Sequence, residues 1–279
     1  MDQIKDLKIQ DISHFDVEIS ALSGKRRKVY VKDKHKKYML KLADIKQNGE
    51  QIPSHISEYT SCKLIDALGY SVQEVCLVTW HENEAVLIEL FDEQIVTFTG
   101  FGDSTLESGN LEYDLDSMAD GLVSAKFAEN PVSFLWNTFI LDSFVCNLDR
   151  HPNNWGFFRK GDVYSPAPLF DLGNSLFSVN ANKLNKNTDV NKLIELYGKS
   201  AILYRGERLG FRDVLRARDN EHLQKALAVF KTKLNAADTK KELRDILANV
   251  LLLNKEYDNY CEFLEQMIDA QTRFFEETL

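Results

Sequence analysis

The sequence has few of the features that mark secreted, metal-binding or membrane proteins. Its four cysteines are scattered along 279 residues and form no CxxC pair, so neither a disulfide framework nor a zinc site is expected. No apolar run approaches the roughly 20 residues that cross a bilayer, and the first residues do not resemble a secretory signal. Acidic residues outnumber basic ones, 43 against 34, which disfavours a general nucleic-acid or anionic-membrane binder. The sequence therefore predicts a globular, cytoplasmic protein.

The first third of the chain is patterned as a small sheet with one helix. Five segments alternate apolar and polar residues or form short apolar runs, as strands do: residues 15–19, 29–31, 37–42, 72–80 and 85–91. Short polar turns join the first three segments, which predicts an antiparallel meander. Apolar residues then recur at helical spacing over residues 54–68, with Ser54 as a predicted cap and Gly69 at the end. This order predicts one lobe.

From about Asp92 the sequence changes to mostly helical patterns. Residues 97–110 are rich in Gly, Ser and Thr and are expected to form a loop. Apolar stripes that we expect to line a core predict three helical regions: residues 115–127, 133–145 and 221 to the C-terminus. No Pro- or Gly-rich linker separates the halves. We therefore predict two lobes, residues 1–92 and 93–279, that meet at a hinge.

One segment in the middle of the chain concentrates polar residues at the end of an apolar helix. Seven of the eight residues from Asn147 to Asn154 are polar or proline, and an aromatic strand follows directly. Polar groups at a buried junction must find hydrogen-bond partners, so this cluster needs a specific reason. A second element follows after a short hairpin, where Asp171 sits among apolar residues and precedes a glycine.

The spacing of three oxygen-bearing side chains indicates phosphoryl transfer. In such sites one carboxylate orients the attacking hydroxyl, while an amide and a second carboxylate hold Mg²⁺ against the nucleotide phosphates. Asp149 and Asn154, five residues apart, and the isolated Asp171 provide this set. A purely structural alternative is also open, with a salt bridge between Asp149 and Arg150, a turn at residues 153–154, and Asp171 as a helix cap.

Together, the elements NLDRHPNNWGF (residues 147–157) and APLFDLGNSL (residues 167–176) resemble the HipA-like kinases, specifically the short, CtkA-like branch of that family. The resemblance covers roughly residues 14–215, whereas the remaining C-terminal residues match only in being helical. It implies an α+β, two-lobed, protein-kinase-like fold of the HipA and phosphatidylinositol-kinase type. The small N-lobe would be β-rich, the C-lobe mostly helical, and ATP would bind between them.

The resemblance implies a role for each residue of the central site. Asp149 would orient or deprotonate the substrate hydroxyl, and Asn154 and Asp171 would be the Mg²⁺ ligands. Lys41, on the strand KYMLK, would pair with the ATP phosphates and offset their charge. Glu58 either forms an ion pair with Lys41 or compensates the dipole of the helix that it begins.

Three further positions have less specific assignments. Residues 87–91 resemble the hinge strand whose backbone groups bond adenine, which makes Glu89 and Phe91 candidates by position. His151 either polarises the transferred phosphate or is a structural hydrogen bonder in a tight polar turn. No role is assigned to Arg150.

Residues 20–28 occupy the place of the phosphate-covering loop, in which Ser23 and Gly24 are candidate nucleotide-binding residues. The loop has one glycine where kinases of the eukaryotic type have three, so its basic residues 25–28 either cover the phosphates or form a solvated turn. HipA-like kinases are controlled by autophosphorylation of a serine in this loop, which implies Ser20 or Ser23 here. A phosphate adds roughly −1.5 to −2 charges, enough to compete with ATP for these cations.

The function implied is transfer of the γ-phosphoryl of Mg·ATP to Ser or Thr hydroxyls of a protein substrate, with autophosphorylation. Two alternatives stay open. One is a phosphatidylinositol-type lipid kinase, which shares DRHxxN but is disfavoured by the acidity of this chain. The other is a nucleotide-binding regulatory module without turnover.

The resemblance says less about partners and biological role. Long HipA toxins carry an additional N-terminal subdomain that we do not expect here, so an antitoxin or other regulatory partner is not implied. Toxin, housekeeping regulator and secreted effector acting in a host cytosol are all compatible with the sequence.

Overall fold

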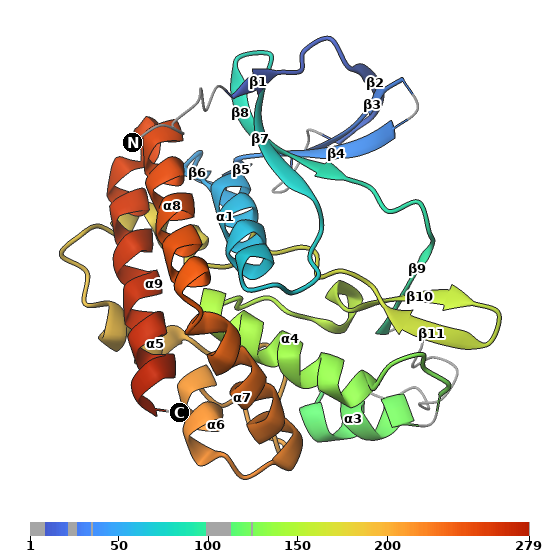
Figure 1. Ribbon diagram of the computed structural model, residues 1–279. Coiled ribbons are helices and arrows are strands. Elements are labelled where there is room, and N and C mark those ends of the chain that lie inside the picture. Colours follow the sequence, from blue (N-terminus) through green and yellow to red (C-terminus); the bar gives the residue numbers. More distant parts are fainter. Residues whose placement is uncertain (1–8, 22–26, 35, 99–112, 124, 279) are drawn as a thin grey trace.

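The computed structural model has a sheet-rich lobe above a helical lobe (Figure 1). It describes residues 9–21, 27–34, 36–98, 113–123 and 125–278. The upper sheet has the strand order β1-β7-β8-β4-β3-β2. Its strands are β1 (Gln10–Asp11), β2 (Asp16–Ala21), β3 (Lys28–Asp33), β4 (Lys36–Leu42), β7 (Val75–Trp80) and β8 (Asn83–Glu89).

Strand pairing confirms the predicted meander and adds two features. Strands β2, β3 and β4 pair antiparallel in chain order, and β7 pairs antiparallel with β8. The predicted strand over residues 72–80 begins only at Val75. Strand β1, which pairs parallel with β7, was not predicted, nor was a hairpin of β5 (Asp44–Ile45) and β6 (Gln51–Ile52). These strands have two residues each, too few to show a period.

Helix α1 (Ser54–Ala67) confirms the predicted helix to within one residue. The predicted capping role of Ser54 is wrong, because Pro53 precedes the helix and the Ser54 hydroxyl accepts the backbone N–H of Asp44 at 3.3 Å. At the other end Gly69 has φ +69°, a left-handed conformation that glycine adopts without strain. In Figure 1, α1 lies between the sheet and the C-terminal helices.

The lower lobe is mostly helical. Its α-helices are α3 (Leu115–Val123), α4 (Pro131–Val145), α5 (Val190–Tyr197), α6 (Phe211–Ala217), α7 (Glu221–Leu234), α8 (Ala237–Leu253) and α9 (Asp258–Thr278). Short 3₁₀ turns are η1 (Pro152–Asn154), η2 (Ser178–Lys183) and η3 (Lys255–Tyr257). A small sheet joins β9 (Ile95–Thr97), β10 (Gly156–Lys160) and β11 (Val163–Pro166).

The three predicted helical regions are present with changed ends. The first stops at Val123 instead of residue 127. The second begins at Pro131, because the side chain of Asn130 caps it by accepting two backbone N–H groups. The C-terminal region is three α-helices rather than one run. Most of the predicted loop over 97–110 lies outside the described residues. No helix in the described part of the chain is long and apolar enough to cross a membrane.

One hydrophobic core extends through both lobes, and this places the site. It includes Ile56 of α1 and Ile88 of β8 together with Phe144 and Leu264 of the helical lobe. A second, smaller cluster lies on the other face of the sheet and includes Leu40. Because side chains alternate along a strand, the residue after Leu40 on β4 faces α1 and the lower lobe. The predicted two-lobed α+β architecture is confirmed.

Candidate active site

The polar cluster predicted at the end of α4 is built around a buried carboxylate. The helix ends at Val145, and the capping residue Cys146, with a φ of 47°, turns the chain sharply. Asp142, one turn earlier, accepts the side-chain amide of Asn147 at 2.9 Å. Arg150 donates to both oxygens of Asp142, from Nε and Nη2, each at 2.9 Å. Asn147 and Arg150, which follow the helix, are therefore both bonded to a carboxylate of the helix itself.

Arg150 is the structural centre of this turn. Its side chain is only 2% exposed. Burial by itself lowers the pKa of the guanidinium, but the Asp142 carboxylate outweighs this and the pKa is raised. The structure thus pairs Arg150 with Asp142 rather than with Asp149, its neighbour in the sequence.

The same guanidinium connects the two sequence elements. Arg150 Nη1 donates to the backbone carbonyl of Asn154 at 2.7 Å and to that of Phe170 at 3.0 Å. Phe170 immediately precedes Asp171. One nitrogen atom of Arg150 therefore bonds the backbone at Asn154 and the backbone next to Asp171, the two predicted metal ligands.

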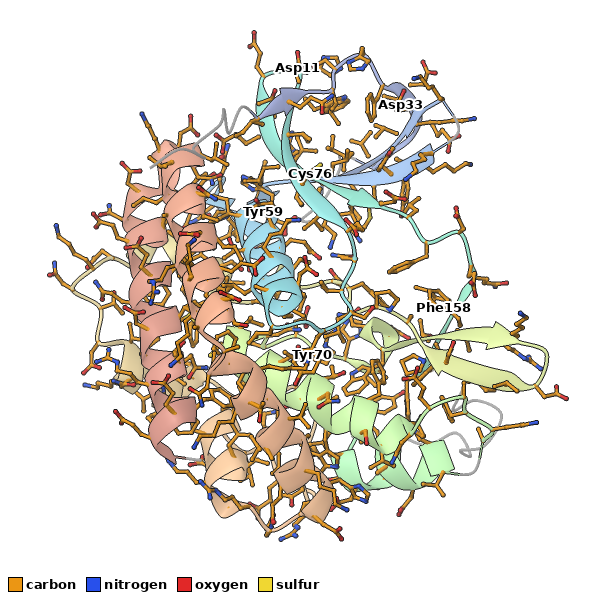
Figure 2. All side chains as sticks on the ribbon, in the orientation of Figure 1. Asp11, Asp33, Tyr59, Tyr70, Cys76 and Phe158 are labelled. Carbon is orange, nitrogen blue, oxygen red and sulfur yellow. The ribbon has the colours of Figure 1, made fainter. Side chains whose placement is uncertain are left out.

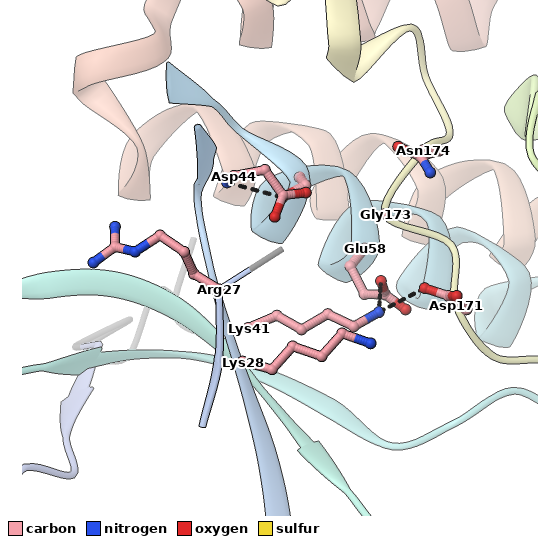
Figure 3. Close-up of a pocket in the computed structure, with 9 residues that line it drawn as sticks. Arg27, Lys28, Lys41, Asp44, Glu58, Asp171, Gly173 and Asn174 are labelled. Carbon is pink, nitrogen blue, oxygen red and sulfur yellow. Dashed lines mark hydrogen bonds and ion pairs between the residues drawn. The ribbon is translucent and has the colours of Figure 1, made fainter. Parts of the chain in front are cut away.

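Lys41 lies at the centre of the site and bonds two carboxylates (Figure 3). Its ammonium is 2.7 Å from Glu58 Oε2 and 2.8 Å from Asp171 Oδ1. Burial alone lowers the pKa of the ammonium, but Glu58 and then Asp171 outweigh it, so the pKa of Lys41 is raised. Lys41 is therefore a fixed cation at neutral pH.

Glu58 is fully buried and joins three parts of the chain. Besides Lys41, it accepts the backbone N–H of Leu172 through Oε1 at 2.9 Å, and the side-chain amide of Gln73 bonds the same oxygen. One residue earlier on α1, the Ser57 hydroxyl donates to the carbonyl of Ser175 at 2.8 Å. Helix α1 is thereby bonded directly to the segment that carries Asp171.

A hydrogen bond from Asn174 connects Asp149 to the site. The side-chain amide of Asn174 donates to Asp149 Oδ2 at 2.6 Å. The Asn154 amide donates to the backbone carbonyl of Asp149 at 3.3 Å. Asp149 and Asn154 are thus connected by a direct hydrogen bond, and Arg150 connects Asn154 to the segment of Asp171.

A cavity opens between the lobes at this point (Figure 3). Its lining is rich in charged groups of both signs: Arg27, Lys28, Lys41, Asp44, Ser54, Glu58, Asp171, Gly173 and Asn174. Lys28 on β3 is directly opposite Lys41 on β4, which places both lysines on the sheet face that looks into the cavity. Three cations beside oxygen donors make this cavity suited to a polyanion that also binds a metal ion.

The residues that line this cavity include neither Glu89 nor Phe91. Glu89 forms an ion pair with Lys36 at 2.7 Å, and its backbone N–H bonds the carbonyl of Glu74 at 3.1 Å. Its side chain is thus not brought to the cavity. Phe91 contacts Phe158 and Phe170 with ring centroids 5.7 and 6.4 Å apart; Figure 2 shows Phe158 on the lower lobe.

The remaining candidates are less defined. His151 is half-buried, precedes η1, and donates its backbone N–H to the carbonyl of Asp149 at 2.9 Å. Ser20 lies in β2, whereas Ser23 and Gly24 lie outside the described residues. The roles of all these residues toward a nucleotide stay predictions.

Asp142, Gln73 and Asn174 were not among the predicted site residues. A lone carboxylate in the apolar run of α4 was a signal for Asp142, because an acid among buried apolar residues needs a partner. Asn174 lies inside the element of residues 167–176. Gln73, in a short connection, offered no signal.

Comparison with known proteins shows the family of this chain. The model of the HipA-like C-terminal domain family matches residues 20–250. Serine/threonine-protein kinase CtkA of Helicobacter pylori strain J99 is 26% identical over 230 residues, which cover 77% of this chain and 69% of CtkA. This similarity supports kinase activity at the level of the family.

Solved structures show the same fold. The crystal structure of a Helicobacter pylori proinflammatory kinase CtkA has a TM-score of 0.82 at 22% identity and covers 97% of both chains. HipA of Shewanella oneidensis MR-1, solved with HipB and operator DNA, has a TM-score of 0.56 at 14% identity over 96% of this chain and 69% of its own. The chain has a two-lobed, kinase-like fold and belongs to the family of the HipA-like C-terminal domain.

Proposed function

We propose that this protein is an ATP-dependent serine/threonine protein kinase that works with Mg²⁺. The observation that carries the proposal is the position of Lys41, whose ammonium is held by Glu58 and Asp171 in a cavity. Asn174, which also lines this cavity, bonds Asp149. A cation for the phosphates, an acidic metal ligand and a carboxylate for the attacking hydroxyl are thereby next to one another.

Each residue then has a defined task. Lys41 neutralises charge on the ATP phosphates, with Lys28 on the same face. Asp149 orients the Ser or Thr hydroxyl and accepts its proton, while the bond from the hydroxyl oxygen to the γ-phosphorus forms. The bond from the γ-phosphorus to the bridging oxygen breaks, and ADP leaves with that electron pair.

The donor set fits magnesium. Asn154 and Asp171 would supply an amide and a carboxylate oxygen, and Mg²⁺ prefers oxygen ligands, a few from protein and the rest from phosphates and water. No group of three His, Cys, Asp or Glu side chains is arranged as a metal site within the described ranges. When bound, the ion would offset the charge that develops on the transferred phosphoryl group.

The lobe boundary and the adenine position also belong to this proposal. The boundary between the lobes would lie at residues 92 and 93. The adenine would lie beside Glu89 and Phe91, where backbone groups rather than the Glu89 side chain would bind it. His151 would assist at the transferred phosphate. Autophosphorylation would modify Ser20 or Ser23 and add negative charge beside Lys28.

The test is incubation of the purified protein with Mg·[γ-³²P]ATP. Wild type should label itself or an added protein on Ser or Thr, and Asp149→Asn should not. Asp162→Asn is the matched control, since that side chain is 97% exposed and lies on the β10–β11 hairpin. Label on phosphoinositide instead of protein would favour the lipid kinase. Nucleotide binding by calorimetry without any label would favour the regulatory module.

A further inference from the structure

We propose that a groove beside the active-site cavity binds an aliphatic side chain of the protein substrate, close to the phosphorylated Ser or Thr. The inference rests on the proposed kinase function and defines a substrate class for it. The groove runs between the β5–β6 hairpin of the upper lobe and η2 of the lower lobe.

Both walls of the groove contribute apolar side chains. Ile45 and Ile52 line it from the hairpin, and Val179 from η2. Val179 is 44% exposed, although most valines are buried in folded proteins. The remaining lining residues are polar: Asp44, Lys46, Gln47, Asn48 and Asn174.

The groove is continuous with the catalytic cavity. Asp44 and Asn174 line both of them. Asn174 donates to Asp149 at 2.6 Å, so the groove begins one side chain away from the carboxylate that would receive the substrate hydroxyl. An extended chain advances about 3.3 Å per residue. A peptide with its hydroxyl at Asp149 can therefore place a nearby side chain in the groove.

Hydrogen bonds hold the two walls together and occupy the charge of Lys46. Glu50, in the turn between β5 and β6, forms an ion pair with Lys46 at 2.9 Å and accepts the amide of Asn182 of η2 at 2.6 Å. Since Lys46 already has a carboxylate partner, the remaining charge in the lining is Asp44, at the end that the groove shares with the catalytic cavity, and the surface beyond it is that of Ile45, Ile52 and Val179. An aliphatic side chain matches this lining better than an acidic or basic one.

The experiment uses the full chain and a peptide library. Peptides with one central Ser or Thr and degenerate flanking positions are incubated with Mg·[γ-³²P]ATP. We expect wild type to prefer Ile, Leu or Val over Asp and Lys at one or two flanking positions by about tenfold, as burial of one aliphatic side chain predicts. Val179→Asp should reduce this preference to about threefold or less, and Val179→Thr, which keeps the shape, should reduce it less.

Val229→Asp is the matched control. Val229 lies on α7, is 49% exposed, and lines neither cavity nor groove, so this variant should keep the wild-type preference. Circular dichroism checks that each variant is folded.

Three results would overturn the inference alone. These are peptide label without an aliphatic preference, a preference that Val179→Asp leaves intact, and label on the protein itself but on no peptide. No label at all in wild type, on protein or peptide, would instead contradict the proposed function and, with it, the groove.

Discussion

Glu58 Oε1 accepts the backbone N–H of Leu172 at 2.9 Å, although the two residues are 114 positions apart in the sequence. The other oxygen of the same carboxylate bonds Lys41. Helix α1, strand β4 and the segment that carries Asp171 are therefore held by one buried side chain. Bonds within the protein fix the cation and the acidic groups of the cavity relative to one another, and such preorganisation is what electrostatic stabilisation of a transition state requires.

The Lys41–Glu58 pair should be strongly coupled in stability. Lys41→Met leaves the buried Glu58 carboxylate without its cation and should lower the free energy of unfolding by about 3 kcal/mol. Glu58→Gln should also destabilise, but the double variant should lose less than the two single changes together. Urea denaturation of the four proteins measures this coupling. If the losses in unfolding free energy are additive, the interaction between Lys41 and Glu58 does not contribute to stability. Lys36→Met, which removes an exposed pair with Glu89, is the control and should cost less than about 1 kcal/mol.

The pH dependence of that effect follows from the raised pKa of Lys41. A cation whose pKa is higher in the folded state contributes its full stability below the unfolded-state pKa, near the ordinary value of 10.5. The contribution is lost only as pH rises through the folded-state value. The difference in unfolding free energy between wild type and Lys41→Met should therefore be constant from about pH 7 to pH 9. Urea denaturation at several pH values measures it, and a difference that shrinks within this range would show that Lys41 deprotonates there.

Arg150→Lys should damage catalysis although it keeps the charge. A single amine cannot bond both oxygens of Asp142 and the carbonyls of Asn154 and Phe170 as the guanidinium does. We expect the phosphoryl-transfer rate to fall about 100-fold and the free energy of unfolding to fall by about 3 kcal/mol.

A second readout separates positioning from simple loss of stability. Because Arg150 holds the backbone of both proposed metal ligands, the variant should need more Mg²⁺ for half its maximal rate, measured at a temperature where it stays folded. An unchanged Mg²⁺ requirement would argue against this role. Arg159→Lys is the control, since Arg159 is 54% exposed and its contacts are with Gly161, Asp162 and the ring of Tyr164 in its own hairpin.

Asn174→Ala should slow phosphoryl transfer with little effect on folding. It removes the amide that bonds Asp149, and a hydrogen bond to a charged group contributes about 1.5–3 kcal/mol, so the rate should fall about 10- to 100-fold. Steady-state kinetics and thermal unfolding measure the two effects. Asn180→Ala, on the exposed part of η2, should leave the rate unchanged. Equal rates for Asn174→Ala and wild type would show that Asn174 has no role in phosphoryl transfer.

Much of the secondary structure could be predicted because periodicity is local. Alternation over residues 29–31 and 37–42 identified β3 and β4, and the spacing over 54–68 identified α1. The ends were less predictable, because they depend on side chains that compete for the same backbone groups. Asn130 caps α4 before the first apolar residue of the expected helix, and Ser54 bonds Asp44 instead of capping α1.

Local sequence was enough to propose Asp149, Asn154, Asp171 and Lys41 as the reacting groups, since they stand in two short elements and on one strand whose residue types local folding alone does not explain. Which side chains contact one another depended on the folded chain. Arg150 could have paired with Asp149 beside it, yet it bonds Asp142 and the carbonyl of Phe170. Such contacts depend on how α1, α4 and the segment after β11 pack around one core, and that packing is a property of the whole chain.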